Sequence, residues 1–270
     1  MNLWSEVSES ELSSVKGICL DIDDTLSTNG KLTAKAFSAL WSLKEHGYAV
    51  VPITGRPAGW CDHIARFWPV DAVIGENGAF SFWMGKSGRR ERYNTLSNFS
   101  PKEAEDKIEQ LKTEILKNYP NAKWASDQSY REYDLAIDFC EDVDRWPAAD
   151  VDALVALCKN IGAEVKISSI HVNAWFGKYD KISGFNAWIK NGLSDCASIS
   201  KKDLLDQKNW IFIGDSPNDE PLFAAFDMSV GVSNLTPFLD RIQSPPKWIT
   251  NGESGNGFVE FAEKLLKNPV

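Results

Sequence analysis

The first part of the chain alternates between short apolar runs and amphipathic stretches. Apolar runs at 18–22, 49–54 and 72–79 predict strands, because they are short and lack the polar alternation of a half-exposed strand. Residues 32–47 and 57–68, which lie between these runs, carry apolar side chains at helical spacing. Strands without polar alternation, separated by helices, indicate a parallel sheet that is covered on both faces.

The same alternation returns after residue 178. The expected elements are helices at 180–192, 219–226 and 257–268, and strands at 209–215, 228–232 and 247–250. We expect these segments to complete the parallel sheet that the first part of the chain begins.

The middle of the chain has a different rhythm. Residues 80–94 predict a hairpin, and helices are expected at 100–120 and 150–162. Residues 130–139 predict a strand that is exposed on one side, and 164–176 predict one further long strand. This pattern is typical of a small α+β domain with an open antiparallel sheet.

The predicted fold class is therefore α/β, with a Rossmann-like parallel-sheet core and an inserted α+β domain. The predicted core comprises residues 1–81 and 177–270, and the predicted insertion comprises residues 82–176. No internal repeat and no low-complexity segment modifies this division.

Charge and composition narrow the functional class. The 270-residue chain has a formal net charge of −9, which argues against unspecific binding to nucleic acid or to anionic membranes. No apolar run approaches the roughly 20 residues that a membrane helix needs. The first residues are polar and acidic, unlike a secretion signal. The five cysteines are widely spaced and form no CxxC pair, which favours reduced thiols and a cytoplasmic protein.

Polar side chains follow the buried strands of the predicted core. The strand-end segments are Asp21-Ile22-Asp23-Asp24-Thr25, Thr54-Gly55-Arg56, Glu76-Asn77-Gly78 and Asp215-Ser216-Pro217-Asn218-Asp219. Ligands of open parallel sheets bind outside the carboxyl ends of the strands. Four polar strand ends from distant parts of the chain therefore predict one site at this edge.

The residue types at this edge suit phosphoryl transfer. Asp21 directly follows its strand and is placed to be a nucleophile, and Asp23, two positions on, is placed to be a general acid and base. Asp215 and Asp219 add carboxylates whose mutual repulsion calls for a cation, and a site made of oxygen ligands favours Mg²⁺. Lys181, at the start of the next helix, would add the fixed positive charge that such chemistry needs.

Four segments in this order resemble the motifs of the haloacid dehalogenase superfamily of phosphohydrolases. They are DIDDT, ITGR, a following lysine and GDSPND, and the resemblance covers the core, about two thirds of the chain. An insertion between the second and third motifs resembles subfamily IIB, the branch with an α+β cap. IGENGAF and GDSPNDEPLF are similar to the Cof-type subgroup that includes the mannosyl-3-phosphoglycerate, sucrose-phosphate and trehalose-phosphate phosphatases.

The resemblance implies a role for each matching residue. Asp21 would attack phosphorus, and Asp23 would protonate the leaving oxygen and then activate water. Asp215 would bind Mg²⁺ together with Asp21 and the backbone carbonyl of Asp23, and Asp219 would support the metal directly or through water. The residues expected to contact the substrate or its phosphoryl group are Thr54, Gly55, Arg56, Asn77, Lys181 and Asn218.

Several positions allow two interpretations. Asp24 is either a turn residue or part of the site, and the turn is the favoured interpretation; Asn77 is either a turn residue or a substrate contact. Lys178 lies three residues before Lys181 and is the alternative motif lysine. The other open positions are His171 and Asn173 on a predicted strand, Arg89, Arg90 and Arg92 in the hairpin as a carboxylate site or a solvated loop, and Trp60 and Trp175 as sugar-stacking or packing residues.

The resulting hypothesis is a cytoplasmic, Mg²⁺-dependent phosphatase that acts on a small soluble phosphate monoester. A sugar phosphate or a glycosyl-phosphoglycerate is the favoured substrate, with no nucleic-acid or membrane partner. The alternatives are a phosphotransferase of the same fold, similar to phosphomannomutases, and a phospho-accepting signalling module, which is about half this length and lacks a GDSPND loop. The pattern leaves open the substrate itself, the specificity residues of the insertion and whether the protein is a monomer or a homodimer.

Overall fold

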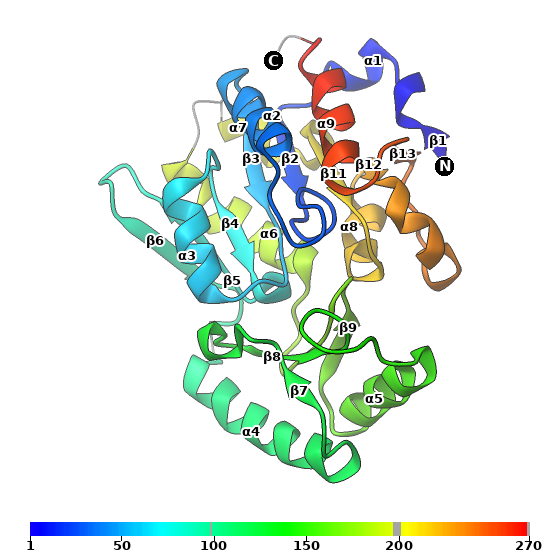
Figure 1. Ribbon diagram of the computed structural model, residues 1–270. Coiled ribbons are helices and arrows are strands. Elements are labelled where there is room, and N and C mark those ends of the chain that lie inside the picture. The colour runs from blue at the N-terminus through cyan, green and yellow to red at the C-terminus, as the bar shows by residue number, and fades with distance from the viewer. Residues whose placement is uncertain (98, 197–200, 269–270) are drawn as a thin grey trace.

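The computed structural model of the chain describes residues 1–97, 99–196 and 201–268, and it consists of two lobes (Figure 1). The upper lobe in this view contains both termini and a six-stranded sheet. The lower lobe contains a four-stranded sheet with two long helices. The parallel-sheet core and the additional antiparallel sheets confirm the predicted α/β class.

The six strands of the core sheet are all parallel. Their order is β1 (Asn2–Leu3), β13 (Trp248–Ile249), β12 (Met228–Gly231), β11 (Trp210–Gly214), β2 (Gly17–Leu20) and β3 (Ala49–Pro52). The chain runs from β2 to β3 in one direction and from β11 to β12 and β13 in the other. Strand order therefore reverses between β2 and β11, which is the position where open α/β sheets bind ligands.

The strands of this core are buried on both faces. Ile18 and Leu20 of β2 pack in a cluster with α2 (Ala34–Glu45) and α9 (Ser254–Leu265). Cys19, between them, faces the opposite cluster, which includes residues of α6 (Lys181–Asn191) and α8 (Glu220–Ala225). Burial on both faces is the reason that these strands show no polar alternation.

The segment after the second core helix differs from the expectation of a third parallel strand. β4 (Val73–Gly75) makes a single parallel bridge to the core, between Ile53 and Ile74. Its ladder is instead antiparallel, with the expected hairpin of β5 (Phe80–Met84) and β6 (Arg90–Asn94). This three-stranded sheet packs against α3 (Ala58–Phe67) and α6 of the upper lobe. The position of the domain boundary at residue 82 stays a prediction.

The lower lobe is built on an open antiparallel sheet, as expected. Its order is β7 (Lys123–Trp124), β8 (Asp134–Asp138), β10 (His171–Trp175) and β9 (Glu164–Ile167). The helices α4 (Pro101–Asn118) and α5 (Ala148–Asn160) supply apolar residues to its core, and Cys158 of α5 is one of them. A capping box of Ser100 and Glu103 begins α4.

Two strand predictions for this lobe are wrong. Residues 164–176 form not one strand but the hairpin of β9 and β10, because the Ser168 hydroxyl accepts hydrogen bonds from the backbone N–H groups of Ile170 and His171 and so stabilises a turn. β8 is buried along its whole length rather than half exposed. Its polar residues Asp134 and Asp138 are buried because each accepts hydrogen bonds within the lobe.

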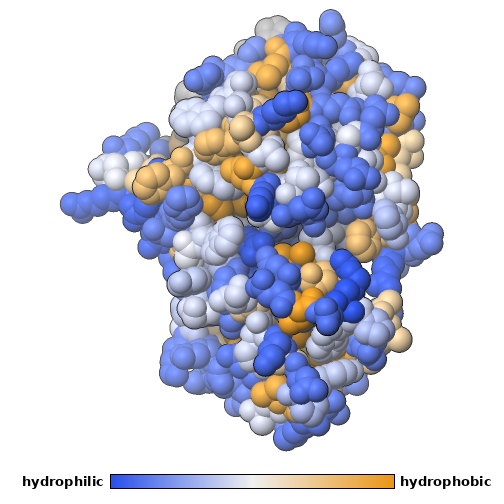
Figure 2. Space-filling model, in the orientation of Figure 1, coloured by the Kyte–Doolittle hydropathy of each residue, from blue (hydrophilic) through white to orange (hydrophobic). Residues whose placement is uncertain are grey.

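The remaining elements are short. They are α1 (Glu9–Leu12), α7 (Lys201–Leu205) and the 3₁₀ turns Trp4–Glu6, Glu76–Gly78, Gln128–Tyr130, Leu193–Asp195, Gln207–Asn209, Pro217–Asp219 and Ser233–Arg241. Hydrophilic residues cover most of the face in Figure 2, and apolar residues form small scattered groups on it. Among the helices of the described residues, none combines the length and the apolarity needed to cross a bilayer.

Candidate active site

The carboxyl ends of β2 and β11 bring the first and last predicted motifs together. Leu20 and Ile213 are partners in the parallel ladder, and the backbone N–H of Asp21 donates to the Ile213 carbonyl at 2.9 Å. Asp21 and Asp215 are therefore adjacent although 194 residues (215 − 21) separate them in the sequence.

Lys181 lies at the centre of these strand ends and is buried. Its Nζ is 2.7 Å from Asp21 Oδ1 and 2.6 Å from Asp219 Oδ1. The capping box of Asp180 and Ser183 begins α6 at this residue and so directs the lysine into the cluster. The structure thus places Lys181 against the carboxylates, whereas Lys178 is exposed.

Asp215 is the residue of this cluster that lacks compensation. Its Oδ1 accepts a hydrogen bond from the Thr25 hydroxyl at 3.1 Å, but its buried Oδ2 has no partner among the described residues. Burial and the charges of Asp21 and Asp219 raise the pKa of Asp215 well above its usual range. An uncompensated carboxylate oxygen in a buried position is costly, and this oxygen is available as a ligand for a cation.

Asp219 is held on both of its carboxylate oxygens. Oδ1 contacts Lys181, and Oδ2 accepts from the backbone N–H groups of Asp215 and Ser216 at 3.0 and 3.3 Å. The carboxylate therefore orients the loop after β11 as well as the lysine.

Asp21, Asp215 and Asp219 form a group that could hold a metal ion. One carboxylate oxygen of each lies within 4.8 Å of the others. Burial raises the pKa of Asp21 to about 7, against the opposing charge of Lys181. Hard oxygen donors, a surplus of negative charge and the orphaned Asp215 Oδ2 fit Mg²⁺, which binds through one or two carboxylates and keeps several waters.

Asp23 lies outside this group and contacts Arg56. The Nε of Arg56 lies 3.1 and 3.0 Å from the two oxygens of Asp23, and Nη2 lies 2.9 Å from Oδ1. Arg56 also donates to two carboxylates of the lower lobe, to Asp127 Oδ2 at 3.2 Å and to Glu141 Oε1 at 2.9 Å. The Trp60 ring lies against the same guanidinium, 4.6 Å from its centroid.

Asp24 occupies the turn in a left-handed conformation, with φ 54°. Its backbone N–H donates to Ser27 Oγ, and its carbonyl accepts from Asn234 Nδ2. This geometry agrees with the interpretation of Asp24 as a turn residue, since an aspartate tolerates left-handed turns.

Among the other predicted phosphate contacts, Gly55 and Asn218 line a cavity with Asp21. The Thr54 hydroxyl is buried and accepts from the backbone N–H of Arg56 at 3.0 Å. A side chain at Gly55 would begin 3.3 Å from Asn77 Nδ2, so the two residues are neighbours. Asn77 has φ 56°, and its buried amide has no hydrogen-bond partner among the described residues. Asn218 accepts from the Ser216 hydroxyl at 2.7 Å and lines a cavity with Asp21.

Arg131 was missed by the sequence analysis, although its side chain is fully buried at the junction of the lobes. It donates to the Gly55 carbonyl at 2.7 Å, to Asp134 Oδ1 at 2.9 Å and to Asp127 Oδ1 at 3.2 and 3.1 Å. The arginine thereby attaches the lower lobe to the loop that carries Thr54 and Arg56.

Glu76 was also missed as a junction residue. Its buried carboxylate accepts from the backbone N–H groups of three consecutive residues of the lower lobe, Glu132, Tyr133 and Asp134, and from that of Ala58. The available signal was an acidic residue at the end of an apolar run, but the sequence does not show which backbone it meets.

Glu141 is the third residue that the sequence analysis missed. Its Oε2 lies 2.8 Å from Nε2 of His171, and its Oε1 contacts Arg56. These contacts, with His171 the strongest, lower the pKa of Glu141 to about 2. His171 thus faces the junction, and Asn173 donates to Asp134 at 2.9 Å, so both are buried rather than on an exposed sheet face.

The remaining candidates lie elsewhere. Arg90 pairs with Asp62 and Arg92 with Glu132, and Arg89 does not line the cavities around Asp21 and Asp23. Trp175 stacks on Tyr179 within the junction. The hairpin arginines therefore do not form the anion site that was one of their two interpretations.

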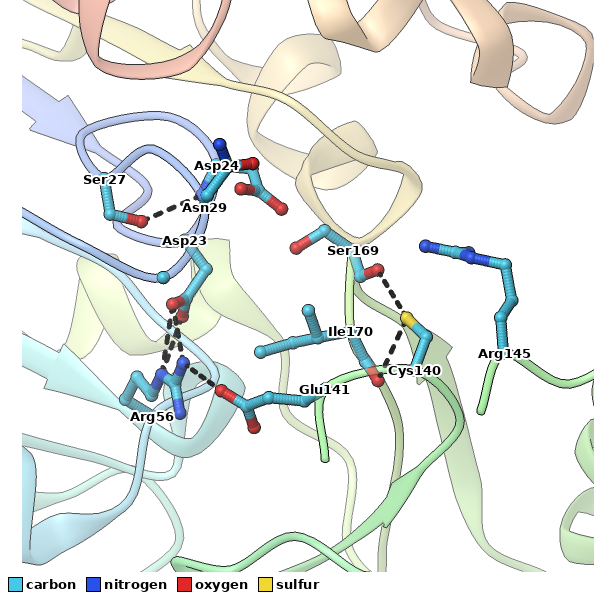
Figure 3. Close-up of a pocket in the computed structure, with 11 residues that line it drawn as sticks. Asp23, Asp24, Ser27, Asn29, Arg56, Cys140, Glu141, Arg145, Ser169 and Ile170 are labelled. Carbon is cyan, nitrogen blue, oxygen red and sulfur yellow. Dashed lines mark hydrogen bonds and ion pairs between the residues drawn. The ribbon is translucent and has the colours of Figure 1, made fainter. Parts of the chain in front are cut away.

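Two cavities adjoin Asp23, and Figure 3 shows the residues that line the larger one. One, of about 260 Å³, lies between the β2 loop with Asp24 and Asn29 and the lower-lobe residues Glu141, Arg145 and Ser169. The other, of about 10 Å³, is lined by Asp21, Asn218 and the turn between β9 and β10. The turn thus covers Asp21, and the larger cavity opens beside it.

Comparisons with known proteins agree with this arrangement. The family model described as haloacid dehalogenase-like hydrolase matches residues 18–135. Phosphoglycolate phosphatase 1 of Saccharolobus solfataricus is 23% identical over 257 residues, which cover 94% of this chain and 96% of the relative.

Two solved structures share the fold. The structure of Thermoplasma acidophilum 0175 has a TM-score of 0.68 at 17% identity and covers 93% of this chain and 98% of its own. The sucrose-phosphatase of Synechocystis, solved in complex with sucrose and phosphate, has a TM-score of 0.63 at 15% identity and covers 92% and 97%. Over residues 18–135 the chain is similar to the haloacid dehalogenase-like hydrolases, and these comparisons support an enzyme of the phosphatase class.

Proposed function

We propose that this enzyme is a Mg²⁺-dependent phosphatase that hydrolyses a small soluble phosphate monoester through an aspartyl-phosphate on Asp21. The observation that carries the proposal is the buried group in which Lys181 contacts Asp21 and Asp219 while the Asp215 Oδ2 has no partner. A sugar phosphate or a phosphorylated hydroxy acid is the substrate class we favour. Sucrose-phosphatase and phosphoglycolate phosphatase are the kinds of relative that support it.

In the first step, a carboxylate oxygen of Asp21 attacks phosphorus and the bond to the leaving oxygen breaks. The proton held by Asp23 passes to that oxygen, so the alcohol departs neutral. Lys181 compensates charge between Asp21 and the phosphoryl group. The Thr54 hydroxyl and the backbone N–H of Gly55 would donate to phosphoryl oxygens.

In the second step, Asp23 takes a proton from water, and the water oxygen attacks phosphorus. The bond to Asp21 breaks, which releases phosphate, restores the Asp21 carboxylate and leaves Asp23 protonated for the next cycle. Overall, ester and water become alcohol and phosphate. The two steps need an attacking and a proton-transferring carboxylate, which Asp21 and Asp23 provide from one loop.

Asp21, Asp215 and the backbone carbonyl of Asp23 would hold Mg²⁺. Asp219 would act through water, because both of its oxygens already have partners. Bound Mg²⁺ would neutralise charge on the phosphoryl oxygens. Without that charge, a dianionic ester would meet a cluster of carboxylates in a chain of net charge −9.

The leaving group would occupy the cavity of about 260 Å³ beside Asp23. This volume is near the lower end of ligand pockets, which favours a small substrate. Arg145 lies on its wall and makes no carboxylate contact within ion-pair distance among the described residues; Figure 3 shows the guanidinium directed toward Ser169. It would suit a carboxylate or a second anionic group of the substrate.

We further propose that residues 82–176 act as a cap that selects the leaving group, with residues 1–81 and 177–270 as the catalytic core. The proposal is supported by the cavity beside Asp23, one wall of which consists of lower-lobe residues. A cytoplasmic location suits the five thiols, which are unpaired.

A phosphatase screen with Mg²⁺ tests the proposal. Phosphate release would be measured from phosphoglycolate, hexose phosphates, mannosyl-3-phosphoglycerate and nucleotides. We expect turnover of a small ester, and we expect Asp21→Asn to lower kcat at least about 10³-fold with unchanged circular dichroism. Asp62→Asn, on the exposed surface of α3, is the matched control. Normal turnover by Asp21→Asn would refute the nucleophile. Turnover that needs a bisphosphate activator would indicate a phosphotransferase instead.

A further inference from the structure

Arg56 makes a two-pronged contact that fixes the orientation of the Asp23 carboxylate. Nε and Nη2 of the guanidinium reach both oxygens, at 2.9 to 3.1 Å. A fork of this kind sets the plane of a carboxylate as well as its position. Asp23 makes no other side-chain hydrogen bond among the described residues, so its orientation depends on Arg56.

The orientation of Arg56, in turn, depends on the lower lobe. Nη1 donates to Asp127 and Nη2 to Glu141, and both acceptors belong to the lower lobe, Asp127 just before the turn Gln128–Tyr130 and Glu141 after β8. The Arg56 side chain is only 6% exposed, so these carboxylates rather than water complete its hydrogen bonding.

The two acceptors are themselves held rigidly. Asp127 accepts from Arg131, which is also attached to the Gly55 carbonyl. The loop that carries Glu141 is fixed by Asp138, whose carboxylate accepts from the backbone N–H groups of residues 140, 141 and 142 at 2.7 to 2.9 Å. The lower lobe therefore presents a preformed receptor for the guanidinium.

We propose that Arg56 is a positioning residue that aligns Asp23 for proton transfer to the leaving group, and that Asp127 and Glu141 make this alignment depend on the seating of the lower lobe. The inference rests on the proposed function, in which Asp23 transfers that proton. Glu141 also lines the leaving-group cavity, so the lobe that encloses the leaving group aligns its proton donor.

The consequence is a dependence on the leaving group that a merely structural contact would not produce. An alkyl phosphate needs a proton on its departing oxygen, whereas 4-nitrophenolate departs readily without one. Misalignment of Asp23 therefore slows the first reaction and spares the second.

The test compares kcat/KM for glycerol 2-phosphate and for 4-nitrophenyl phosphate in the full-length, Mg²⁺-loaded enzyme. Arg56→Lys keeps the positive charge but loses the two-pronged contact with Asp23. Asp127→Asn removes the charge of one acceptor, at a residue that lines neither cavity beside Asp23. Glu141→Gln removes the charge of the second acceptor. We expect each to lower kcat/KM for the alkyl ester by about 10- to 100-fold, part of the usual contribution of general acid catalysis, and for the aryl ester by less than about 3-fold. Glu132→Gln, which breaks the Arg92 pair on the same lobe, is the control and should change neither.

Equal losses for both esters, or no loss for either, would overturn the inference while leaving the phosphatase intact. Failure of the wild-type enzyme to hydrolyse both esters would count against the proposed function itself. A variant that does not fold would be replaced by Arg56→Gln with added guanidinium, and recovery of alkyl ester turnover alone would support the positioning role. Absence of recovery in a folded Arg56→Gln variant would count against it.

Discussion

Two buried cations, Lys181 beside Asp21 and Arg56 beside Asp23, are each surrounded by three carboxylates. Around Arg56 every carboxylate contacts the guanidinium, and the cation has a partner for each of its edges. Around Lys181 only two of the three do so, and Asp215 Oδ2 has no partner among the described residues.

This difference in contacts suits the Arg56 cluster to positioning side chains and the Lys181 cluster to binding a metal and a phosphoryl group. A fork that meets its carboxylates directly fixes their geometry. A lysine is a point charge, and it leaves carboxylate oxygens available for a metal and for attack on phosphorus. Equal numbers of acidic residues therefore have different consequences, according to the cation beside them.

Removal of Lys181 gives the largest expected effect on stability. Lys181→Met would leave two buried carboxylates without their partner, and we expect the free energy of unfolding in EDTA to fall by about 3–5 kcal/mol. Urea denaturation measures this change. Lys178→Met, three residues away and exposed, is the control and should change little. Equal values for the two variants would contradict the central place of Lys181.

Magnesium should distinguish the two clusters next. At about 100 times its Kd, Mg²⁺ should stabilise the wild-type protein by about 2.7 kcal/mol, because it binds only the folded state. Asp215→Asn should lose most of this gain, since the orphaned oxygen is then part of a neutral amide. Thermal unfolding with Mg²⁺ and with EDTA measures the gain, and Asp127→Asn, in the Arg56 cluster, should retain it. A full gain in Asp215→Asn would show that the metal binds elsewhere.

The smallest expected effect is a pH dependence at the Arg56 cluster. His171 and Arg56 lower the pKa of Glu141 to about 2, from 4.5 in the absence of such contacts. The folded state therefore holds this proton more weakly than the unfolded state, and the stabilisation is present above pH 4.5 and lost as the pH falls toward 2.

Glu141→Gln should accordingly be less stable than wild type near neutral pH, by on the order of 1 kcal/mol, because the group is partly exposed. The difference should shrink as the pH falls from 4.5 toward 2. Urea denaturation at several pH values measures it, with Glu114→Gln on the exposed face of α4 as control. A difference in stability between wild type and Glu141→Gln that grows toward low pH would contradict the lowered pKa of Glu141.

The sequence predicted the placement of the Lys181 cluster better than that of the Arg56 cluster, for a physical reason. Asp21 and Asp215 directly follow buried strands, and parallel pairing brings such residues to one edge. Arg56 was expected at this edge too, but as a phosphate contact. Its partners Asp127 and Glu141 depend on how the second lobe docks, which no local pattern encodes.

The strand predictions divide in the same way. The core strands were recognisable because burial on both faces removes polar residues from them. The prediction that β8 is exposed on one side was wrong, since its aspartates are buried in a hydrogen-bond network. The turn within 164–176 was not predicted because the segment contains no glycine or proline, the residues that usually mark a turn, and Ser168 stabilises it instead.

The buried cysteines allow the unfolding of each lobe to be measured separately. Cys19 is enclosed in the core sheet and Cys158 in the lower lobe, and burial raises the pKa of each thiol, to about 11 for Cys158. A thiol reagent can reach either side chain only when its own lobe opens. The natural chain thus reports, through which of these two cysteines is labelled first, whether its lobes unfold together or one after the other.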